Sequence, residues 1–308
     1  MGSSYGAFMR FSYWTPNTLS WDDTRAAAQS AADLGYSCFW YADHFMPNAP
    51  EPADGPVHEA FTMLAAVAAA VPTIRLGTMV AGNTYRHPAV LAKIAATLDH
   101  VSNGRFTLGL GAGWQENEHA AYGIEFNTFG WRFDRLEETC AALQSLFTEQ
   151  RTTLVGKHVQ LTNAPLDPKP VQSPLPLLIG GGGEKRTLRI VAQYAQAWNV
   201  WGTPELLAQK IGVLNGHCAD LGRDPSTITK TAVALLFLTD NAEQAAKLRS
   251  GPAPRPMIIG TAPEVAEQMR AFGAAGVDEF IVPGFTFRSV TERDDVLGRI
   301  MAEVAPHC

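Results

Sequence analysis

The sequence predicts an α/β protein folded as a (β/α)8 barrel, the TIM barrel, with an insertion between its fourth and fifth units. Short β-like apolar runs alternate with helical stretches along the chain, a pattern typical of parallel sheets covered by helices. Several of the runs end in histidine, aspartate, asparagine or glycine, and barrel enzymes bind ligands at the carboxyl ends of their strands. A doubly wound open sheet is the alternative, but no G-x-G-x-x-G follows the first strand.

The first four strand–helix units are delimited by capping and turn residues. Ser20 is placed to cap the N-terminus of the first helix, and Gly35 follows its end. Pro72 ends the second helix, and Pro88 suits the first turn of the third. These signals predict strands at residues 7–13, 37–42, 74–80 and 105–109, and helices at residues 21–34, 58–71, 88–101 and 131–148.

The second half of the chain holds the expected insertion and four further strands. Residues 152–161 alternate around Gly156-Lys157, which predicts a β-hairpin, and a proline-rich stretch follows it. We interpret residues 151–176 as the insertion and residues 1–308 as a single domain. The remaining strands are expected at residues 177–179, 198–201, 229–238 and 279–282, and helices at residues 185–196, 204–221 and 263–273.

The composition favours a protein that acts on small molecules. A formal net charge of −6 without a basic stripe argues against nucleic-acid binding. No apolar run reaches the about 18 residues that span a bilayer, and the first residues lack the apolar core of a signal peptide. The four cysteines form no C-x-x-C pair and no cluster with zinc spacing. We therefore expect free thiols, no bound metal, no membrane partner and a cytoplasmic location.

An aspartate–histidine pair ends the second predicted strand. Imidazole has two distinct nitrogens and changes charge near neutral pH, so His44 can donate a hydrogen bond or move a proton. Asp43 can orient that ring. The alternative is that Asp43 caps the loop and His44 is not catalytic. The position of the pair at the carboxyl end of a barrel strand favours catalysis.

Two glycine-rich turns after later strands suit a bound cofactor. Residues 111–113 are Gly-Ala-Gly, whose small or absent side chains would let a ligand approach the backbone. A tight turn without a ligand also explains them. Trp114 can stack on a flat ring, and Asn117 can donate an amide N–H to a ring carbonyl. Residues 180–183 precede a helix, where backbone N–H groups and the helix dipole favour a phosphate. Lys185-Arg186 would add positive charge there.

In their order and spacing, several segments resemble the bacterial luciferase-like monooxygenase family. They are Y-A-D-H-F at 41–45, L-G-T-M-V at 76–80, H-P-A-V-L-A-K at 87–93, the stretch 99–114, I-G-G-G-G-E at 179–184 and the stretch 259–282. Within the family, the chain is most similar to the branch that uses the 8-hydroxy-5-deazaflavin coenzyme F420. The resemblance implies the same barrel, F420 at its carboxyl face, hydride transfer to or from a small organic substrate, and a homodimer.

The resemblance also implies roles for individual residues. His44 lies close to the reactive ring and stabilises or protonates the developing charge, with Asp43 orienting it. A cis peptide between Met79 and Val80 supports the ring from behind. The expected cofactor contacts are Asp43, His44, Met79, Val80, Ala112, Gly113 and Asn117, with Gly181 and Gly182 at the phosphate. The expected substrate contacts are Trp14 and Trp114.

The substrate and the choice of cofactor stay open in the sequence. Glucose-6-phosphate dehydrogenases of the F420 branch carry a glutamate where this chain has Trp114, which argues against a sugar phosphate. Residues 85–87 after the third strand are candidates to meet an acidic substrate, and the loop 46–56 and the insertion are expected to shape the pocket. FMN fits the same glycine turn, so an oxygen-using FMN-dependent monooxygenase is the first alternative. A non-catalytic flavin-binding protein is the second.

Overall fold

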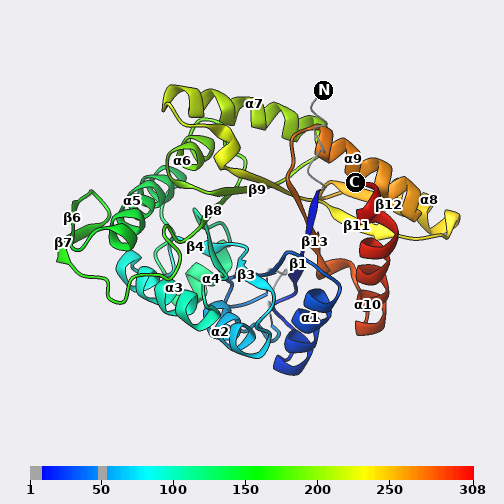
Figure 1. Cartoon of the computed structure of the whole chain (residues 1–308), viewed down its shortest axis with the longest axis horizontal. Coiled ribbons are helices and arrows are strands. Elements are labelled where there is room, and N and C mark those ends of the chain that lie inside the picture. The colour runs from blue at the N-terminus through cyan, green and yellow to red at the C-terminus, as the bar shows by residue number, and fades with distance from the viewer. Residues whose placement is uncertain (1–8, 48–53) are drawn as a thin grey trace, which may run out of the picture.

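The computed structural model describes residues 9–47 and 54–308, and a closed ring of eight parallel strands forms its centre (Figure 1). The ring closes because the first strand pairs with the last and the third pairs with the fourth. The prediction of a (β/α)8 barrel is therefore confirmed. In order around the ring, the strands are β1 (Arg10–Thr15), β2 (Cys38–Tyr41), β3 (Arg75–Thr78), β5 (Phe106–Gly111), β8 (Leu177–Gly180), β9 (Ala197–Trp201), β10 (Thr229–Val233) and β13 (Glu279–Pro283).

Helices surround the barrel because the outward-facing strand residues are apolar and need cover. Phe39 and Tyr41 of β2 point outward and are completely buried under the helices. The predicted cap of the first helix is present, since the Ser20 side chain accepts a hydrogen bond from the amide of Asp23. The surrounding helices are α1 (Trp21–Asp33), α2 (Ala60–Ala70), α3 (Pro88–Ser102), α5 (Phe129–Thr148), α6 (Thr187–Tyr194), α7 (Pro204–Asp220), α9 (Ala262–Ala274) and α10 (Val290–Arg299).

The barrel interior is a separate apolar cluster that reaches up to the carboxyl ends of the strands. Alternate residues of each strand point inward, so side chains from different strands meet on the axis. Trp14, Val80 and Trp201 pack on top of this cluster and make the mouth of the barrel aromatic and apolar. The cluster consists of Cys38, Trp40, Met79, Leu178, Val233 and Ile281.

The prediction of one continuous strand over residues 229–238 is wrong. It divides after Val233: β10 stays in the barrel, and β11 (Leu235–Leu238) leaves it to pair in parallel with β12 (Met257–Gly260). No glycine or proline marks the break in the sequence. The change of partner is decided by a distant segment, since the amide of Leu235 donates to the carbonyl of Pro256 at 2.8 Å. The sequence also did not indicate β4 (Ala81–Gly82), β12, α4 (Glu116–Tyr122), α8 (Ala242–Ser250) or α10.

The predicted hairpin is present between the fourth and fifth barrel strands. Its strands β6 (Thr152–Val155) and β7 (Gln160–Ala164) pair antiparallel, and Figure 1 shows them at the outer edge of the molecule beside α5. Glu138 of α5 accepts hydrogen bonds from three successive turn amides, those of residues 157, 158 and 159, at 2.7–2.9 Å. A Cβ at Gly156 would lie 2.7 Å from the backbone carbonyl oxygen of Val159 and 2.4 Å from Oε2 of Glu138, so the turn favours a glycine there.

Three of the expectations concern membrane-spanning helices, metal sites and cysteines. Within residues 9–47 and 54–308, no helix is long and apolar enough to cross a bilayer. The same residues hold no group of three or more histidine, cysteine, aspartate or glutamate side chains arranged for a metal ion. All four cysteines are free thiols. Residues 7–8 of the first expected strand and residues 48–53 of the loop 46–56 lie outside the described part of the chain.

Candidate active site

The predicted site residues follow four different barrel strands and lie at the same end of the ring. His44 follows β2, Val80 follows β3, Gly113 follows β5, and Gly182 follows β8. These strands are parallel neighbours, so their carboxyl ends meet at one mouth. The structure thus places the expected cofactor contacts around one opening.

His44 is held by a buried glutamate. Its Nδ1 lies 2.7 Å from Oε1 of Glu118, whose side chain is 0% exposed, while the His44 side chain is 19% exposed. Glu118 also accepts the amide of Phe45 at 2.8 Å and the hydroxyl of Tyr85. Burial alone would raise the pKa of Glu118, but the bonds from His44, Phe45 and Tyr85 outweigh it and lower that pKa. Glu118 is therefore a carboxylate, and Nδ1 of His44 must be the donor.

The hydrogen bond of the His44 ring leaves its other nitrogen available. No atom of the described residues is hydrogen-bonded to Nε2. A neutral ring that donates from Nδ1 carries its lone pair on Nε2, so this atom can accept a proton. The Trp114 ring stands edge-on to the imidazole, with 5.5 Å between the centroids, and is 56% exposed. The exposed Trp114 and the available Nε2 together form one side of the mouth.

Asp43 has a different role from the expected one. Its buried carboxylate accepts two hydrogen bonds from Arg86, at 2.7 and 3.0 Å, and one from the amide of Gly82. Burial raises the pKa of Asp43, and Arg86 opposes that rise. Burial would lower the pKa of Arg86, but Asp43 and Glu59 outweigh it, so we take the pair as ionised. The expectation that Asp43 orients His44 is corrected: Asp43 secures the loop after β3, and Glu118 bonds the ring.

The peptide between Met79 and Val80 is cis, as the resemblance implied. The Val80 side chain lies in a space left by three glycines of the neighbouring strands. A Cβ at Gly109, Gly111 or Gly180 would come within 2.9–3.1 Å of a Val80 methyl group. The glycines on β5 and β8 therefore make room for Val80, so Gly111 and Gly180 have a packing role in addition to the approach of a ligand that their sequence context suggests.

The turn after β5 contributes Ala112, Gly113 and Asn117 to the mouth. Gly113 has φ +85°, and a Cβ there would lie 2.8 Å from the Thr84 hydroxyl, so the turn requires glycine. The Asn117 side-chain oxygen accepts the amide of Glu118 at 2.9 Å, and its NH₂ group makes a long 3.4 Å bond to the carbonyl of Pro47. Asn117 therefore positions Glu118, and its NH₂ group is only weakly held.

The turn after β8 fits a phosphate. The amide of Gly181 is used within the barrel, but those of Gly182 and Gly183 donate to no atom of the described residues. Lys210 lies beside them, with Nζ 2.7 Å from the carbonyl of Gly182 and 3.4 Å from the carboxylate of Glu184. Free N–H groups and a nearby ammonium are what an anion requires. The expected contribution of Arg186 is corrected, because it is ion-paired with Asp134 and α6 begins only at residue 187.

Sequence reasoning missed Glu118 and Lys210 and misjudged residues 85–87. The sequence assigns Glu118 no role, because the short helix α4 that carries it is not among the predicted elements. Tyr85 and Arg86, proposed to meet an acidic substrate, bond Glu118 and Asp43 instead, and His87 caps α3. A helical pattern over residues 116–122 is the signal that would have brought Glu118 to the mouth.

The lowered pKa of Glu118 predicts a pH-dependent contribution to stability. The carboxylate is stabilised in the folded chain, so its contribution is present above the ordinary glutamate pKa of about 4.3 and is lost as the pH falls through the folded value. Glu118→Gln should lower the melting temperature near pH 7, and the difference from the parent should shrink below about pH 4. Thermal melts across this range are the measurement. The exposed Glu116→Gln on the same helix is the matched control, with a small, pH-independent change; a constant deficit for Glu118→Gln would contradict the prediction.

Comparisons with known proteins identify relatives of two chemical kinds. A family model described as luciferase-like monooxygenase matches residues 9–258. The F420-dependent glucose-6-phosphate dehydrogenase of Amycolatopsis mediterranei is 36% identical over 169 residues, which cover 54% of this chain and 48% of that protein. The pyrimidine monooxygenase RutA of Stutzerimonas stutzeri is 31% identical over 199 residues, which cover 62% of this chain and 53% of that protein. Both matches span about half the length of the relative.

A solved structure has the same architecture over nearly the whole chain. The coenzyme F420 dependent tetrahydromethanopterin reductase from Methanopyrus kandleri is similar with a TM-score of 0.82, covering 97% of this chain and 99% of that chain. The two sequences are 17% identical. At this identity the likeness supports the barrel fold.

Proposed function

Because this chain belongs to the luciferase-like monooxygenase family, we propose that it is an F420-dependent oxidoreductase that transfers a hydride between the deazaflavin and a small organic substrate. The observation that carries the proposal is the bond between His44 and the ionised, buried Glu118 at the mouth of the barrel. The F420-dependent relative supports the choice of cofactor.

The residues around the mouth suit this cofactor. The free amides of Gly182 and Gly183, with Lys210 beside them, would hold the phosphate. Met79, Val80, Ala112, Gly113 and Asn117 would line the rest of the cofactor, next to His44. The deazaflavin, when bound, supplies a ring carbon that takes up or releases a hydride.

The protein's own contribution to the reaction is proton transfer at His44. When a substrate hydroxyl is oxidised, Nε2 of His44 accepts the O–H proton; when a carbonyl is reduced, it returns that proton to the oxygen. Glu118 keeps the other proton on Nδ1 and stabilises the positive ring with its negative charge. Trp114 and Trp14 would form the walls that hold the substrate close to Nε2.

The test is a parallel titration of the purified protein with F420, oxidised and reduced, and with FMN, followed by cofactor fluorescence. We expect F420 to bind at least about tenfold more tightly than FMN, a difference of about 1.4 kcal/mol. Tighter FMN binding would favour the second candidate, an oxygen-using FMN-dependent monooxygenase, which the match to the pyrimidine monooxygenase supports. Binding of neither would overturn the assignment to both cofactors.

The assembly of the protein is proposed on its resemblance to the family, and its location on the composition of the sequence. We expect a single-domain chain, residues 1–308, that forms a homodimer in the cytoplasm. Size-exclusion chromatography with light scattering would measure the oligomeric state, and a monomer would contradict the expected dimer.

A further inference from the structure

Near the carboxyl end of the barrel, two hydrogen-bond donors have no acceptor among the described residues. Nε1 of Trp14, at the end of β1, is buried and has no partner among the described residues. Arg255, just before β12, is exposed; its side chain makes no hydrogen bond or ion pair with the described residues, and its guanidinium lies over an aromatic ring. A buried N–H without an acceptor costs free energy unless something binds it.

The two donors belong to one aromatic cluster. The Arg255 guanidinium lies 5.1 Å from the centroid of the Trp201 ring. The Trp201 ring lies 6.1 Å from that of Trp14, which has Phe285 edge-on at 4.8 Å. Trp14 and Trp201 both pack on the interior cluster, so these rings lie at the top of the barrel axis. The Trp201 ring therefore lies beside both the cation of Arg255 and the ring of Trp14, which carries the unused N–H donor.

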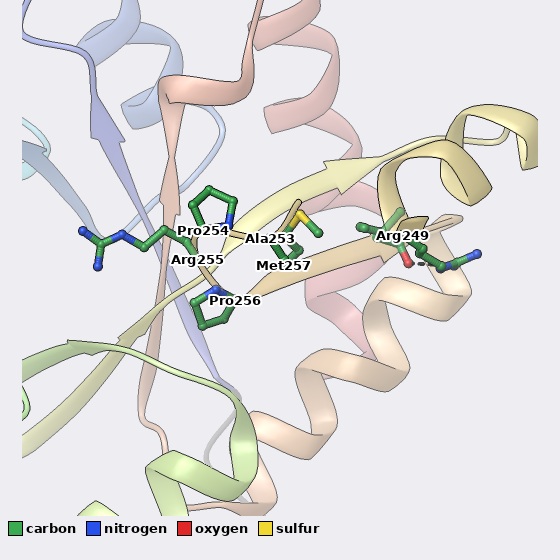
Figure 2. A pocket seen from close by; sticks show the side chains of 7 residues that line it. Arg249, Ala253, Pro254, Arg255, Pro256 and Met257 are labelled. Atoms are coloured by element: carbon green, nitrogen blue, oxygen red, sulfur yellow. Dashed lines mark hydrogen bonds between the residues drawn. The ribbon is translucent and has the colours of Figure 1, made fainter. Parts of the chain in front are cut away.

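Arg255 differs from the other arginine of this region. Figure 2 shows the side chains of Arg255 and Arg249 extending in opposite directions from the segment that lines a cavity of about 520 Å³. Arg249 donates to the carbonyl of Ile259 at 3.0 Å, so its guanidinium has a structural partner. Arg255 is thus the arginine available to a ligand, and Arg249 is its natural control.

We propose that Trp14, Trp201 and Arg255 form the subsite for the charged end of the substrate, and that the substrate is a small planar carboxylate. A guanidinium binds a carboxylate through two parallel N–H bonds, and the indole N–H can donate to the same group. The aromatic rings accept a flat apolar body. One guanidinium and one neutral donor match a monoanion, whereas a phosphate dianion calls for more positive charge. The assignment of this anion as the substrate rests on the proposed function, but binding of the anion to the subsite does not require the cofactor.

The test uses 4-fluorobenzoate as the probe and 4-fluorobenzamide as its neutral counterpart of similar shape. Binding to the full-length protein, with and without F420, is followed by fluorine NMR line broadening. We expect saturable binding of the benzoate, at least tenfold weaker binding of the benzamide, and at least a tenfold loss of benzoate affinity in Arg255→Ala. Trp14→Phe keeps the ring and removes the N–H, and should weaken the benzoate several-fold. Arg249→Ala should leave the affinity unchanged, with melting temperatures confirming that each variant folds.

Several outcomes would overturn the subsite. They are no binding of 4-fluorobenzoate, equal affinity for both probes, or equal losses in Arg255→Ala and Arg249→Ala. Loss of F420 binding in Arg255→Ala would assign this arginine to the cofactor instead. If the parent protein binds no F420 but binds benzoate in an Arg255-dependent way, the proposed function fails and the subsite stands. The two failures are therefore distinguishable.

Discussion

His44→Ala is expected to lower kcat/KM by about 10²- to 10⁴-fold, the usual contribution of a positioned acid or base, while F420 still binds. The variant removes Nε2, the atom that accepts or returns the substrate proton, and leaves the glycine turn and Lys210 unchanged. Turnover is measured with the first substrate found to change the redox state of the bound deazaflavin, and cofactor affinity by fluorescence.

The control for His44→Ala is His307→Ala, which changes an exposed histidine near the end of the chain. It should keep both turnover and cofactor affinity. Unchanged turnover in His44→Ala would show that this histidine is not catalytic. Equal loss of turnover and of F420 binding would instead make His44 a cofactor-holding residue. If the parent protein binds F420 but no substrate changes it, the non-catalytic alternative gains support.

Gly109→Ala is expected to lower the free energy of unfolding by at least about 3 kcal/mol, or to prevent folding. A Cβ at this position would lie 1.9 Å from the backbone carbonyl oxygen of Thr78 and 3.1 Å from a Val80 methyl group. The Thr78 hydroxyl also donates to the carbonyl of Gly109 and accepts from its amide, so the two strands cannot separate without losing both bonds. Because the clash is with backbone, no rotamer change relieves it. Chemical denaturation measures the difference.

Gly216→Ala is the matched control for Gly109→Ala. Gly216 is exposed within α7, and a Cβ there meets nothing within 4 Å. It should raise stability by roughly 0.5–1 kcal/mol, because alanine is the better helix former. If both variants changed stability by similar small amounts, the close approach of Thr78 to Gly109 would be wrong.

Elements whose signals are local in the chain were predicted well from the sequence. The cap at Ser20, the proline at the start of α3 and the hairpin turn at Gly156 each act through residues a few positions away. The misjudged strand 229–238 shows the limit. Its apolar pattern is the same on both sides of the break, and its second half pairs with a segment about twenty residues further on.

The sequence by itself determined the barrel, the face on which the proposed site lies, and the histidine at the end of β2. These follow from hydrophobic periodicity, caps and turns, which are properties of short segments. Only the tertiary structure decided which groups bond to each other. Glu118 lies 74 positions from His44, and Arg86 lies 43 positions from Asp43. Hydrogen-bond partners at such separations depend on how the loops after different strands fold over one another, and no local pattern encodes that. For the same reason, only the assembled barrel shows that the Val80 side chain packs against glycines of β5 and β8, where a larger residue would clash with it.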